Sequence, residues 1–544
     1  MALIRGENQL TLNPQQVMNL QLWIAILMIA VLMIYIILKK NNLHVQSIAL
    51  ILSAVMKKCN LHIKPPNIRK ALLLFLFIVA IIACINYFYI SRTPGSYIHR
   101  WDMFHTYMGT KYYDELGYTK LYECAVSLDA RHINFYENLD RIRELSTLKY
   151  ISAELVVEES DCEVLFSKDR KNEFINDLKF FNSLTYPQYW NRLFRDKGYN
   201  GSPFYTYVLS KLVNNVALSY RNLILLAMID IILILVSFYF VYRAFGIWTC
   251  LIALIFFCVN FPARFVHMGG SILRFDYIAY LIIGLCFYKL KSYKISGLFL
   301  ALSAMLRIFP IVFAVGLGLK ALVDLIKSKK IERKYLSFFA VFFSAMILFF
   351  ILSLTIGQGL DNWHSFIENM QIHNQQTAGF RIGFKHIFMF SGEITEEDPW
   401  VSYAEKQELF ENRIGYFYAS IFLVGLLLLL LMPFMKDEDV IILFGTAMFF
   451  FIFASTRYYY AVLVLLFLLQ SKCKSLVMLM LYIFTAIALW VYSFNQFDAF
   501  IYNYLLSFIL LIFFIITFGC LIINHRKELS SLYSAAKPKI KFIT

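Results

Sequence analysis

Long apolar runs dominate this sequence, and most are close to the length of about 20 residues that a helix needs to cross a membrane. The runs are 18–38, 70–90, 221–242, 245–262, 271–290, 335–357, 414–433, 438–455, 457–471, 474–492 and 499–523. Charged residues make up only 16% of the chain, whereas soluble domains have about 25%. The pattern excludes a soluble multidomain protein. It predicts an all-α polytopic membrane protein with about 10–12 transmembrane helices.

The net charge of +15 follows the membrane topology rather than indicating a nucleic-acid partner. Segment 91–220 has 16 basic and 17 acidic residues, and segment 358–413 has 4 and 9. The basic excess therefore lies in short loops and tails, which the positive-inside rule places in the cytoplasm. This orientation puts 91–220 and 358–413 outside as water-facing loops. It leaves no reason to expect nucleic acid as a partner.

This topology divides the chain into three parts. Residues 1–69 hold an N-terminal span and a cytoplasmic segment, in which Gln46–Met56 is too short to span and is expected to be interfacial or packed in the core. Residues 70–471 form the transmembrane core with both outer loops, and 472–544 supply the last spans and a basic cytoplasmic tail. Apolar residues at helical spacing in 91–220 predict several short helices in this first outer loop.

One stretch breaks the alternation of inside and outside. The basic loops Lys289–Lys294 and Lys320–Lys334 can both be cytoplasmic only if 295–319 does not cross as one full span. Pro310 interrupts helical hydrogen bonding within this stretch. We therefore expect a hairpin of two short helices that turns near Arg307. The alternative is one kinked span with a basic loop on the unexpected side.

Nine cysteines are present, and only Cys124 and Cys162 fall in the first outer loop. An oxidising compartment would let these two pair, and two unrelated thiols are the alternative. The sequence contains no C-x-x-C and no metal-ligand spacing, so it indicates no metal site, although a divalent metal is not excluded.

The densest polar cluster, His99 to Gly109, follows directly after the span 70–90. Asp102 lies about ten residues beyond the membrane exit, where a carboxylate can reach both a lipid headgroup and a water-soluble acceptor. It is our candidate general base, with His105 and Tyr107 as candidate substrate contacts. The alternative for Asp102 is a helix N-cap, for which Asp is a preferred residue.

A second cluster, Arg264 to Asp276, occupies a short loop predicted to be outside. The positive-inside rule disfavours Arg264 and Arg274 there, so a further role is expected. Arginine binds phosphate with a planar fork of donors, and Gly269-Gly270 would let backbone N–H groups approach an anion. Asp276 joins these candidates for substrate binding. Snorkelling of both arginines to lipid phosphates is the alternative.

Arg307 is a third candidate, because an ionisable residue deep in the membrane is costly and indicates function. We expect it to bind an anionic headgroup, and a buried ion pair with Asp230 is the alternative. From the second outer loop His373 is the candidate substrate contact, while neighbours such as Arg381 are interpreted as surface residues. Arg457 to Tyr460 is interpreted as part of an interfacial belt.

Several of these segments resemble the GT-C superfamily of membrane glycosyltransferases, most closely its bacterial polyprenyl-phosphate-mannose-dependent mannosyltransferase-like branch. The likeness covers roughly residues 70 to 470. The matching segments are Arg100-Trp101-Asp102 through Gly117-Tyr118-Thr119-Lys120-Leu121-Tyr122, Gly198-Tyr199-Asn200, Leu273-Arg274-Phe275-Asp276 and Leu306-Arg307-Ile308-Phe309-Pro310. The acidic pair of some branches is absent at 102–103, where Met103 follows Asp102.

The resemblance implies a GT-C-like bundle in the bacterial inner membrane with its active site facing outside. Asp102 matches the catalytic carboxylate, the donor would be a polyprenyl-phosphate-linked sugar, and the acceptor a glycan, lipid or protein. Transfer would invert the anomeric carbon, with the arginines stabilising the departing phosphate. A transporter or flippase of lipid-linked sugars, and a lipid-linked glycan polymerase or ligase, are the alternatives.

Overall fold

The protein is described by a computed structural model that covers residues 14–40, 68–88, 97–375, 381–390, 404–494 and 499–530. Helices make up 79% of the structure, and its strands form two short two-stranded ladders. The expected all-α fold is therefore confirmed. The segment Gln46–Met56, expected to be interfacial, lies outside the described residues.

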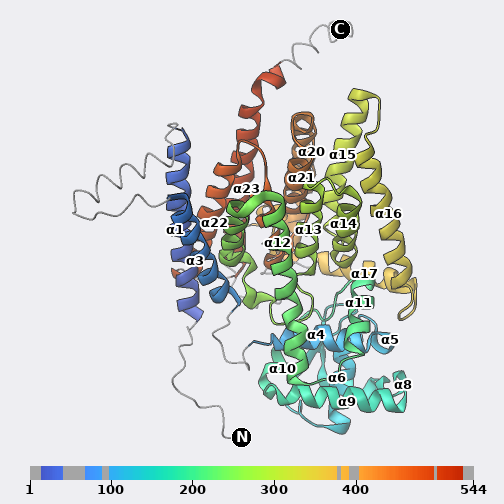
Figure 1. Ribbon diagram of the computed structural model, residues 1–544. Coiled ribbons are helices and arrows are strands. Elements are labelled where there is room, and N and C mark those ends of the chain that lie inside the picture. Colours follow the sequence, from blue (N-terminus) through green and yellow to red (C-terminus); the bar gives the residue numbers. More distant parts are fainter. Residues whose placement is uncertain are drawn as a thin grey trace, which may run out of the picture.

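The first outer loop folds into a layer of short helices at one end of the molecule (Figure 1). Its elements are α4 (Arg100–Lys111), α5 (Tyr113–Leu116), α6 (Leu121–His132), β1 (Arg141–Arg143), β2 (Tyr150–Ser152), α7 (Ala153–Glu159), α8 (Cys162–Leu165), α9 (Lys168–Ser183), α10 (Pro187–Leu193) and α11 (Pro203–Val213). Aromatic side chains fill the core of this layer, and Phe104 packs edge-to-face on Trp190 with ring centroids 4.8 Å apart. A disulfide joins Cys124 of α6 to Cys162 of α8.

The remaining helices form the bundle, which stands on this layer (Figure 1). They are α1 (Pro14–Lys40), α3 (Ile68–Phe88), α12 (Tyr220–Val259), α13 (Asp276–Lys289), α14 (Tyr293–Arg307), α15 (Ile311–Ser328), α16 (Arg333–Ser353), α20 (Ile414–Leu431), α21 (Asp437–Ile452), α22 (Lys474–Phe494) and α23 (Ala499–Asn524). Connecting pieces are η2 (Phe261–Ala263), η3 (Phe265–His267), α17 (Asp361–Gln375), β3 (Arg381–Ile382), α18 (Phe384–Phe388), α19 (Ala404–Asn412), η4 (Met432–Phe434), β4 (Ser455–Thr456) and η5 (Arg457–Leu468).

Seven helices among the described residues are long and apolar enough to cross a membrane, fewer than the 10–12 expected. One of them, α12, is 40 residues long and breaks at Gly246, so it covers the two predicted spans 221–242 and 245–262. The predicted spans 271–290 and 438–455 correspond to α13 and α21, of 14 and 16 residues. At 1.5 Å per residue these reach about 21–24 Å, less than the core thickness of about 30 Å. The run 457–471 forms the 3₁₀ helix η5 instead.

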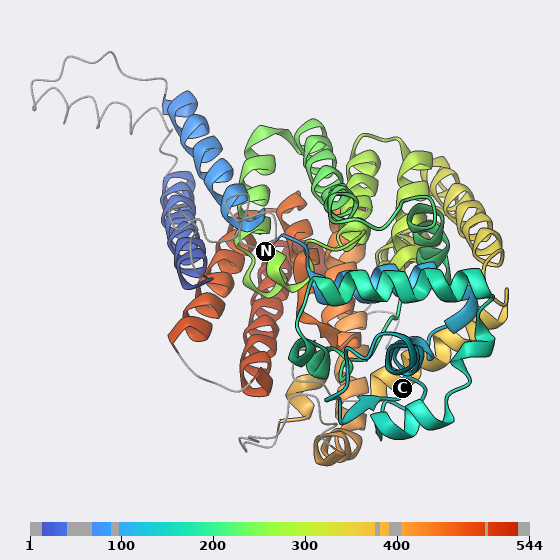
Figure 2. The ribbon, with the colours of Figure 1, turned by 90° about the horizontal axis from the view of Figure 1, so that it is seen from below.

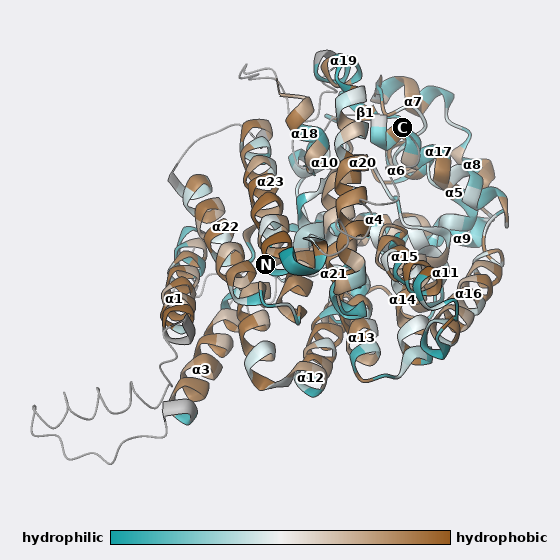
Figure 3. Cartoon of the chain, turned by 90° about the horizontal axis from the view of Figure 1, so that it is seen from above, coloured by the Kyte–Doolittle hydropathy of each residue, from teal (hydrophilic) through white to brown (hydrophobic). Residues whose placement is uncertain are grey.

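Apolar side chains cover much of the outside of the bundle, as a lipid solvent requires. Figure 3 shows brown along α1, α3, α16 and α20, and more teal around α5, α8 and α17 of the outer layer. Trp23 of α1 and Phe422 of α20 are 68% and 69% exposed. Such exposure of large apolar residues on many helices identifies an integral membrane protein.

Helices α14 and α15 form the hairpin that the basic loops predicted. Tyr335, at the start of α16, donates from its hydroxyl to Asp324 near the end of α15 and to Asp437 at the start of α21. Tyr288 at the end of α13 also donates to Asp437, at 2.8 Å, and packs against Tyr293 at the start of α14. The start of α14 and the end of α15 therefore lie at the same end of the bundle. The turn between them, at Ile308–Pro310, lies at the other end, beside the outer layer.

The outer layer covers only one side of the bundle end. Seen from below in Figure 2, its teal helices lie across one side, while the blue and red helices α1, α3, α22 and α23 stand at the other. Helix α1 packs against α22, although the two lie near opposite ends of the chain. In the same part of the bundle Cys473 and Cys520 are joined, a pairing that the sequence did not predict.

Candidate functional site

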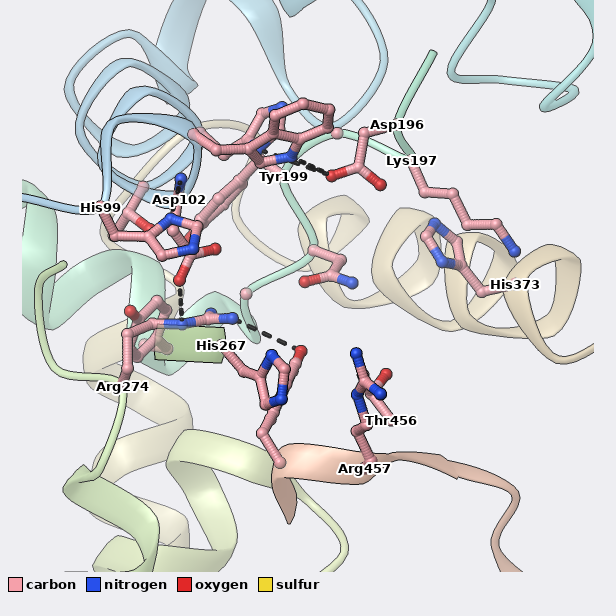
Figure 4. Close-up of a pocket in the computed structure, with 18 of the residues that line it drawn as sticks. His99, Asp102, Asp196, Lys197, Tyr199, His267, Arg274, His373, Thr456 and Arg457 are labelled. Atoms are coloured by element: carbon pink, nitrogen blue, oxygen red, sulfur yellow. Dashed lines mark hydrogen bonds and ion pairs between the residues drawn. The ribbon is translucent and has the colours of Figure 1, made fainter. Parts of the chain in front are cut away.

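A cavity of about 460 Å³ lies where the outer layer meets the bundle (Figure 4). Six separate parts of the chain line it: α4 with the residue before it, the segment 196–201 before α11, the loop 267–274, the end of α17, the start of β3, and the end of β4 with the start of η5. Its volume is in the range of about 300–1,000 Å³ that is usual for small-molecule sites. The lining is rich in charged groups.

Asp102 and Arg274 form an ion pair on the cavity wall. The distance from Arg274 Nε to Asp102 Oδ2 is 2.7 Å, and both side chains are largely buried, at 12% and 16% exposure. Arg274 Nη2 also donates to the hydroxyl of Tyr458 at 3.4 Å, whereas its Nη1 has no protein hydrogen bond among the described residues. The guanidinium is thus held by two contacts, through Nε and Nη2, and its remaining N–H groups are available to a ligand.

The first turn of α4 directs Asp102 toward the cavity. His99, and not Asp102, caps this helix, because His99 Nδ1 accepts from the backbone N–H of Asp102 at 3.1 Å. The N-cap alternative for Asp102 is therefore wrong. The backbone N–H of His99 in turn donates to the carbonyl of Gly270 at 2.9 Å. Gly270 has a φ of +83°, and a Cβ there would collide with the carbonyl of Tyr97. Gly270 therefore allows the chain to pack closely beneath α4. It does not line the cavity, so its predicted role in an anion site is not met.

Asp230 of α12 supports the backbone that carries Arg274. Its two carboxylate oxygens accept from the backbone N–H groups of Arg274 and Phe275 at 2.9 and 3.1 Å. Leu273 just before them has a φ of +47°, which a non-glycine residue rarely adopts. The fully buried carboxylate of Asp230 therefore stabilises the irregular turn that precedes α13.

Arg307 lies one layer behind the cavity and does not line it. Its guanidinium sits 3.8 Å from the centre of the Tyr205 ring, its Nη2 donates to the carbonyl of Leu273 at 3.0 Å, and its Nε lies 3.8 Å from Asp276 Oδ1. The buried partner is Asp276 and not Asp230, which corrects that alternative. Arg307 and Asp276 therefore support Tyr205 and the 273–276 turn. Neither residue lines the cavity, so the prediction that they contact substrate is not met.

The opposite wall of the cavity is cationic. Lys197, His373 and Arg381 all line it, and neither Lys197 nor Arg381 forms an ion pair with a carboxylate in the described ranges. Burial, together with the charges of Arg381 and Arg143, lowers the pKa of Lys197 to about 7. Burial and the same cluster of cations lower the pKa of His373 to about 3, so this ring is neutral near pH 7. Arg381 donates from Nη2 to the carbonyl of His373 at 2.6 Å, which holds the wall together.

A short β-ladder brings two arginines to the cavity. Strand β3 pairs with β4, with Arg381 opposite Thr456, and Arg457 follows directly. Arg457 and Tyr458 line the cavity, so the interpretation of these two residues as part of an interfacial belt is wrong. Arg264 lies outside the cavity, with its guanidinium 4.4 Å from the centre of the Phe261 ring.

Two separate hydrogen bonds hold Trp101 and His105, which line the cavity on the same side as Asp102. Trp101 Nε1 donates to Asp196 Oδ2 at 2.6 Å, and His105 Nε2 lies 2.5 Å from the hydroxyl of Tyr122. Burial lowers the pKa of His105 and outweighs the nearby charge of Asp196. His105 is thus a neutral, fixed group beside Asp102.

Four of the eight residues predicted to act in catalysis or substrate binding line this cavity: Asp102, His105, Arg274 and His373. The four that do not are Tyr107, Arg264, Asp276 and Arg307. Tyr107 is fully buried in the outer layer, where its hydroxyl donates to the carbonyl of Val216. Lys197, Asp196, Arg381 and Arg457 also line the cavity and were not predicted as site residues from the sequence. The positive-inside rule disfavours cations in segments predicted to be outside, and this argument selected Arg264 and Arg274. The same argument could have selected Arg457.

The described side chains include no group of three or more His, Cys, Asp or Glu residues placed to hold a metal ion. No family model, curated protein or solved structure matches this chain. The site itself therefore carries the functional argument. It offers one carboxylate that can accept a proton beside several cations that can hold an anion.

Proposed function

We propose that this protein is an inverting membrane glycosyltransferase of GT-C type, which moves a sugar from a polyprenyl-phosphate donor to an acceptor hydroxyl. The observation that carries the proposal is the placement of the Asp102–Arg274 pair and the cations Lys197 and Arg381 around one cavity. Glycosyl transfer from a lipid phosphate needs a base for the acceptor and positive charge for the leaving group. Both are provided at this one site.

In the proposed reaction Asp102 takes the proton of the acceptor hydroxyl as its oxygen attacks the anomeric carbon. The bond from that carbon to the phosphate oxygen breaks, and the electron pair leaves with the lipid phosphate. Arg274, Lys197 and Arg381 stabilise the negative charge on the departing phosphate. A phosphate needs no general acid as a leaving group, and a single displacement inverts the anomeric carbon.

The basic loops favour an extracytoplasmic site. Loops 290–292 and 329–332 lie at the end of the bundle that holds Asp437, opposite the cavity. The positive-inside rule places that end in the cytoplasm. The cavity then faces outside, where lipid-linked sugars and an envelope acceptor would meet, in the bacterial inner membrane by the resemblance described above.

A flippase would need charged groups that exchange partners along a path. Asp230 and Arg307, two ionisable residues within the bundle, are both held by fixed partners: Asp230 by two backbone N–H groups, and Arg307 by Asp276 and the Leu273 carbonyl. This arrangement favours an enzyme. A lipid-linked glycan polymerase or ligase would use the same chemistry with a longer donor.

The test is transfer by full-length protein in proteoliposomes. The donors are polyprenyl-phosphate-linked mannose, glucose and galactose with radiolabelled sugars, and the acceptors come from a membrane extract of the host. Asp102→Asn removes the base, and we expect transfer to fall about 10²- to 10⁴-fold with unchanged thermal stability. Asp140→Asn is the matched control, since Asp140 is an exposed carboxylate of the same outer layer. Near-normal transfer by Asp102→Asn, or movement of unchanged lipid across the bilayer without a new glycosidic bond, would contradict the proposal.

A further inference from the structure

A second cavity, of about 360 Å³, lies between residues 113–120 and the helix α17. It stands back to back with the first. Tyr118 lines the second cavity and stacks on Tyr199, which lines the first, with ring centroids 6.1 Å apart. The Tyr118 hydroxyl donates to the carbonyl of Gly201 at 2.8 Å. One aromatic wall therefore separates the two cavities.

Several polar side chains of the second cavity have no protein partner. Asn369 of α17 is only 7% exposed, and its amide forms no hydrogen bond with any described residue. The side chains of Thr119, Ser146, Gln358 and Ser365 also line the cavity without a partner in the described ranges. A ligand that supplies hydroxyl groups would satisfy these donors and acceptors together.

The charge of this cavity is opposite to that of the first. Among the described residues that line it, the single basic one, Lys120, is paired with Glu123 at 2.8 Å, whereas Asp114 and Glu368 contribute negative charge. Asp114 accepts from the backbone N–H of Gly357 at 2.6 Å, which leaves its second oxygen for a ligand. Phosphate and other anions are therefore disfavoured, while the hydroxyls of an uncharged ligand can donate to these carboxylates.

We propose that the second cavity binds an uncharged sugar unit of the acceptor glycan, away from the hydroxyl that reacts. The acceptor role rests on the function proposed above, but the binding itself does not. Amide, hydroxyl and carboxylate groups bind the sugar hydroxyls, and the rings of Tyr113 and Tyr118 form the apolar wall. The site would make the enzyme prefer acceptors of more than one sugar.

The experiment places full-length protein in lipid nanodiscs on a printed array of neutral, anionic and amino-sugar glycans at pH 7. Two variants change the cavity: Asn369→Ala removes the unpartnered amide, and Ser365→Trp adds bulk from an exposed position of α17 that tolerates it. Asn215→Ala is the matched control, since Asn215 is an exposed asparagine bonded to the carbonyl of Lys211. Thermal melting checks that every variant is folded.

We expect the wild type to retain neutral glycans, and each cavity variant to bind them at least tenfold more weakly. Asn215→Ala and Asp102→Asn should bind like the wild type, since neither touches the cavity. Retention of anionic or amino-sugar glycans alone, of no glycan, or equal retention by Ser365→Trp would overturn the inference. Normal sugar transfer by Asp102→Asn, with glycan binding still lost in Asn369→Ala, would remove the proposed function and leave this site standing.

Discussion

Lys197 and the half-buried Arg381 line the same cavity wall, and burial together with the charge of Arg381 lowers the pKa of Lys197 to about 7. The two residues come from distant parts of the chain and meet only at the cavity wall that faces Asp102. Buried cations without a carboxylate partner are costly, and an anion bound between them would relieve that cost. The pair therefore favours a ligand with a phosphate.

The titration of Lys197 predicts a pH dependence of donor binding. Lys197 is charged below pH 7 and loses its proton as the pH rises through 7, so an anionic ligand should bind more weakly at pH 8.5 than at pH 6. Arg381 and Arg143 lower this pKa and Asp196 raises it. We expect roughly a tenfold loss of affinity, or about 1.4 kcal/mol. A polyprenyl phosphodiester is the probe, because a diester has no second ionisation in this range.

The matched variant for this titration is Lys197→Arg, which stays charged throughout and should flatten the pH profile. Lys197→Gln should bind the phosphodiester weakly at every pH. Isothermal titration calorimetry in detergent measures both affinities. A wild-type profile that is flat, or that rises with pH, would show that Lys197 does not hold the anion.

Removing Arg307 should destabilise the fold rather than only reduce donor binding. Arg307→Met leaves the fully buried Asp276 without its cation and the Leu273 carbonyl without its donor. Breaking a buried pair costs about 3–5 kcal/mol. We expect a clear drop in the melting temperature, measured by intrinsic fluorescence in detergent. The double variant with Asp276→Asn should recover part of that loss, and a stable Arg307→Met protein that fails to bind donor would instead support direct contact.

Asp230 should be required for the position of Arg274. Asp230→Ala leaves two buried backbone N–H groups without an acceptor, at a cost of about 1–3 kcal/mol each. Asp230→Asn keeps one acceptor oxygen and should be milder in both stability and transfer. Melting temperature and transfer are measured on the same preparations. If both variants melt and transfer like the wild type, the carboxylate does not hold the 273–275 turn.

The Cys124–Cys162 disulfide should stabilise the outer layer. It closes a loop with a sequence separation of 38, and loop-closure entropy predicts about 4 kcal/mol. Replacing both cysteines with serine should make the outer layer more sensitive to limited proteolysis while the bundle stays resistant. Mass spectrometry after thiol labelling, without reductant, detects the bond directly. Free thiols at both positions would exclude it.

The apolar runs predicted the bundle well because a lipid solvent demands long apolar helices, which sequence shows directly. They failed at 271–290, where residues 271–275 form an irregular turn and the helix α13 begins only at Asp276. That turn depends on Asp230 and on the close approach at Gly270, which are contacts between distant residues. Hydropathy does not report such contacts.

The candidate site was predicted only where local signals exist. Asp102 was predicted because it is a carboxylate in an aromatic segment just after a span. Arg274 was predicted because the positive-inside rule disfavours a cation in a loop predicted to be outside. Arg381 was taken for a surface residue, because its place on the cavity wall depends on the pairing of β3 with β4, a strand that follows only after the helices α20 and α21. The sequence also suggested the wrong ion-pair partner for Arg307, Asp230, whereas the structure pairs Arg307 with Asp276.

The central claim is that the cavity beside Asp102 holds the donor phosphate, and an electron cryomicroscopy structure of the full chain with a polyprenyl-phosphate sugar analogue tests it most directly. We predict density for the phosphate within hydrogen-bonding distance of Arg274 and near Lys197 and Arg381, with the sugar beside Asp102. Density for the phosphate at the opposite end of the bundle, or on the membrane side with the cavity unoccupied, would contradict the account.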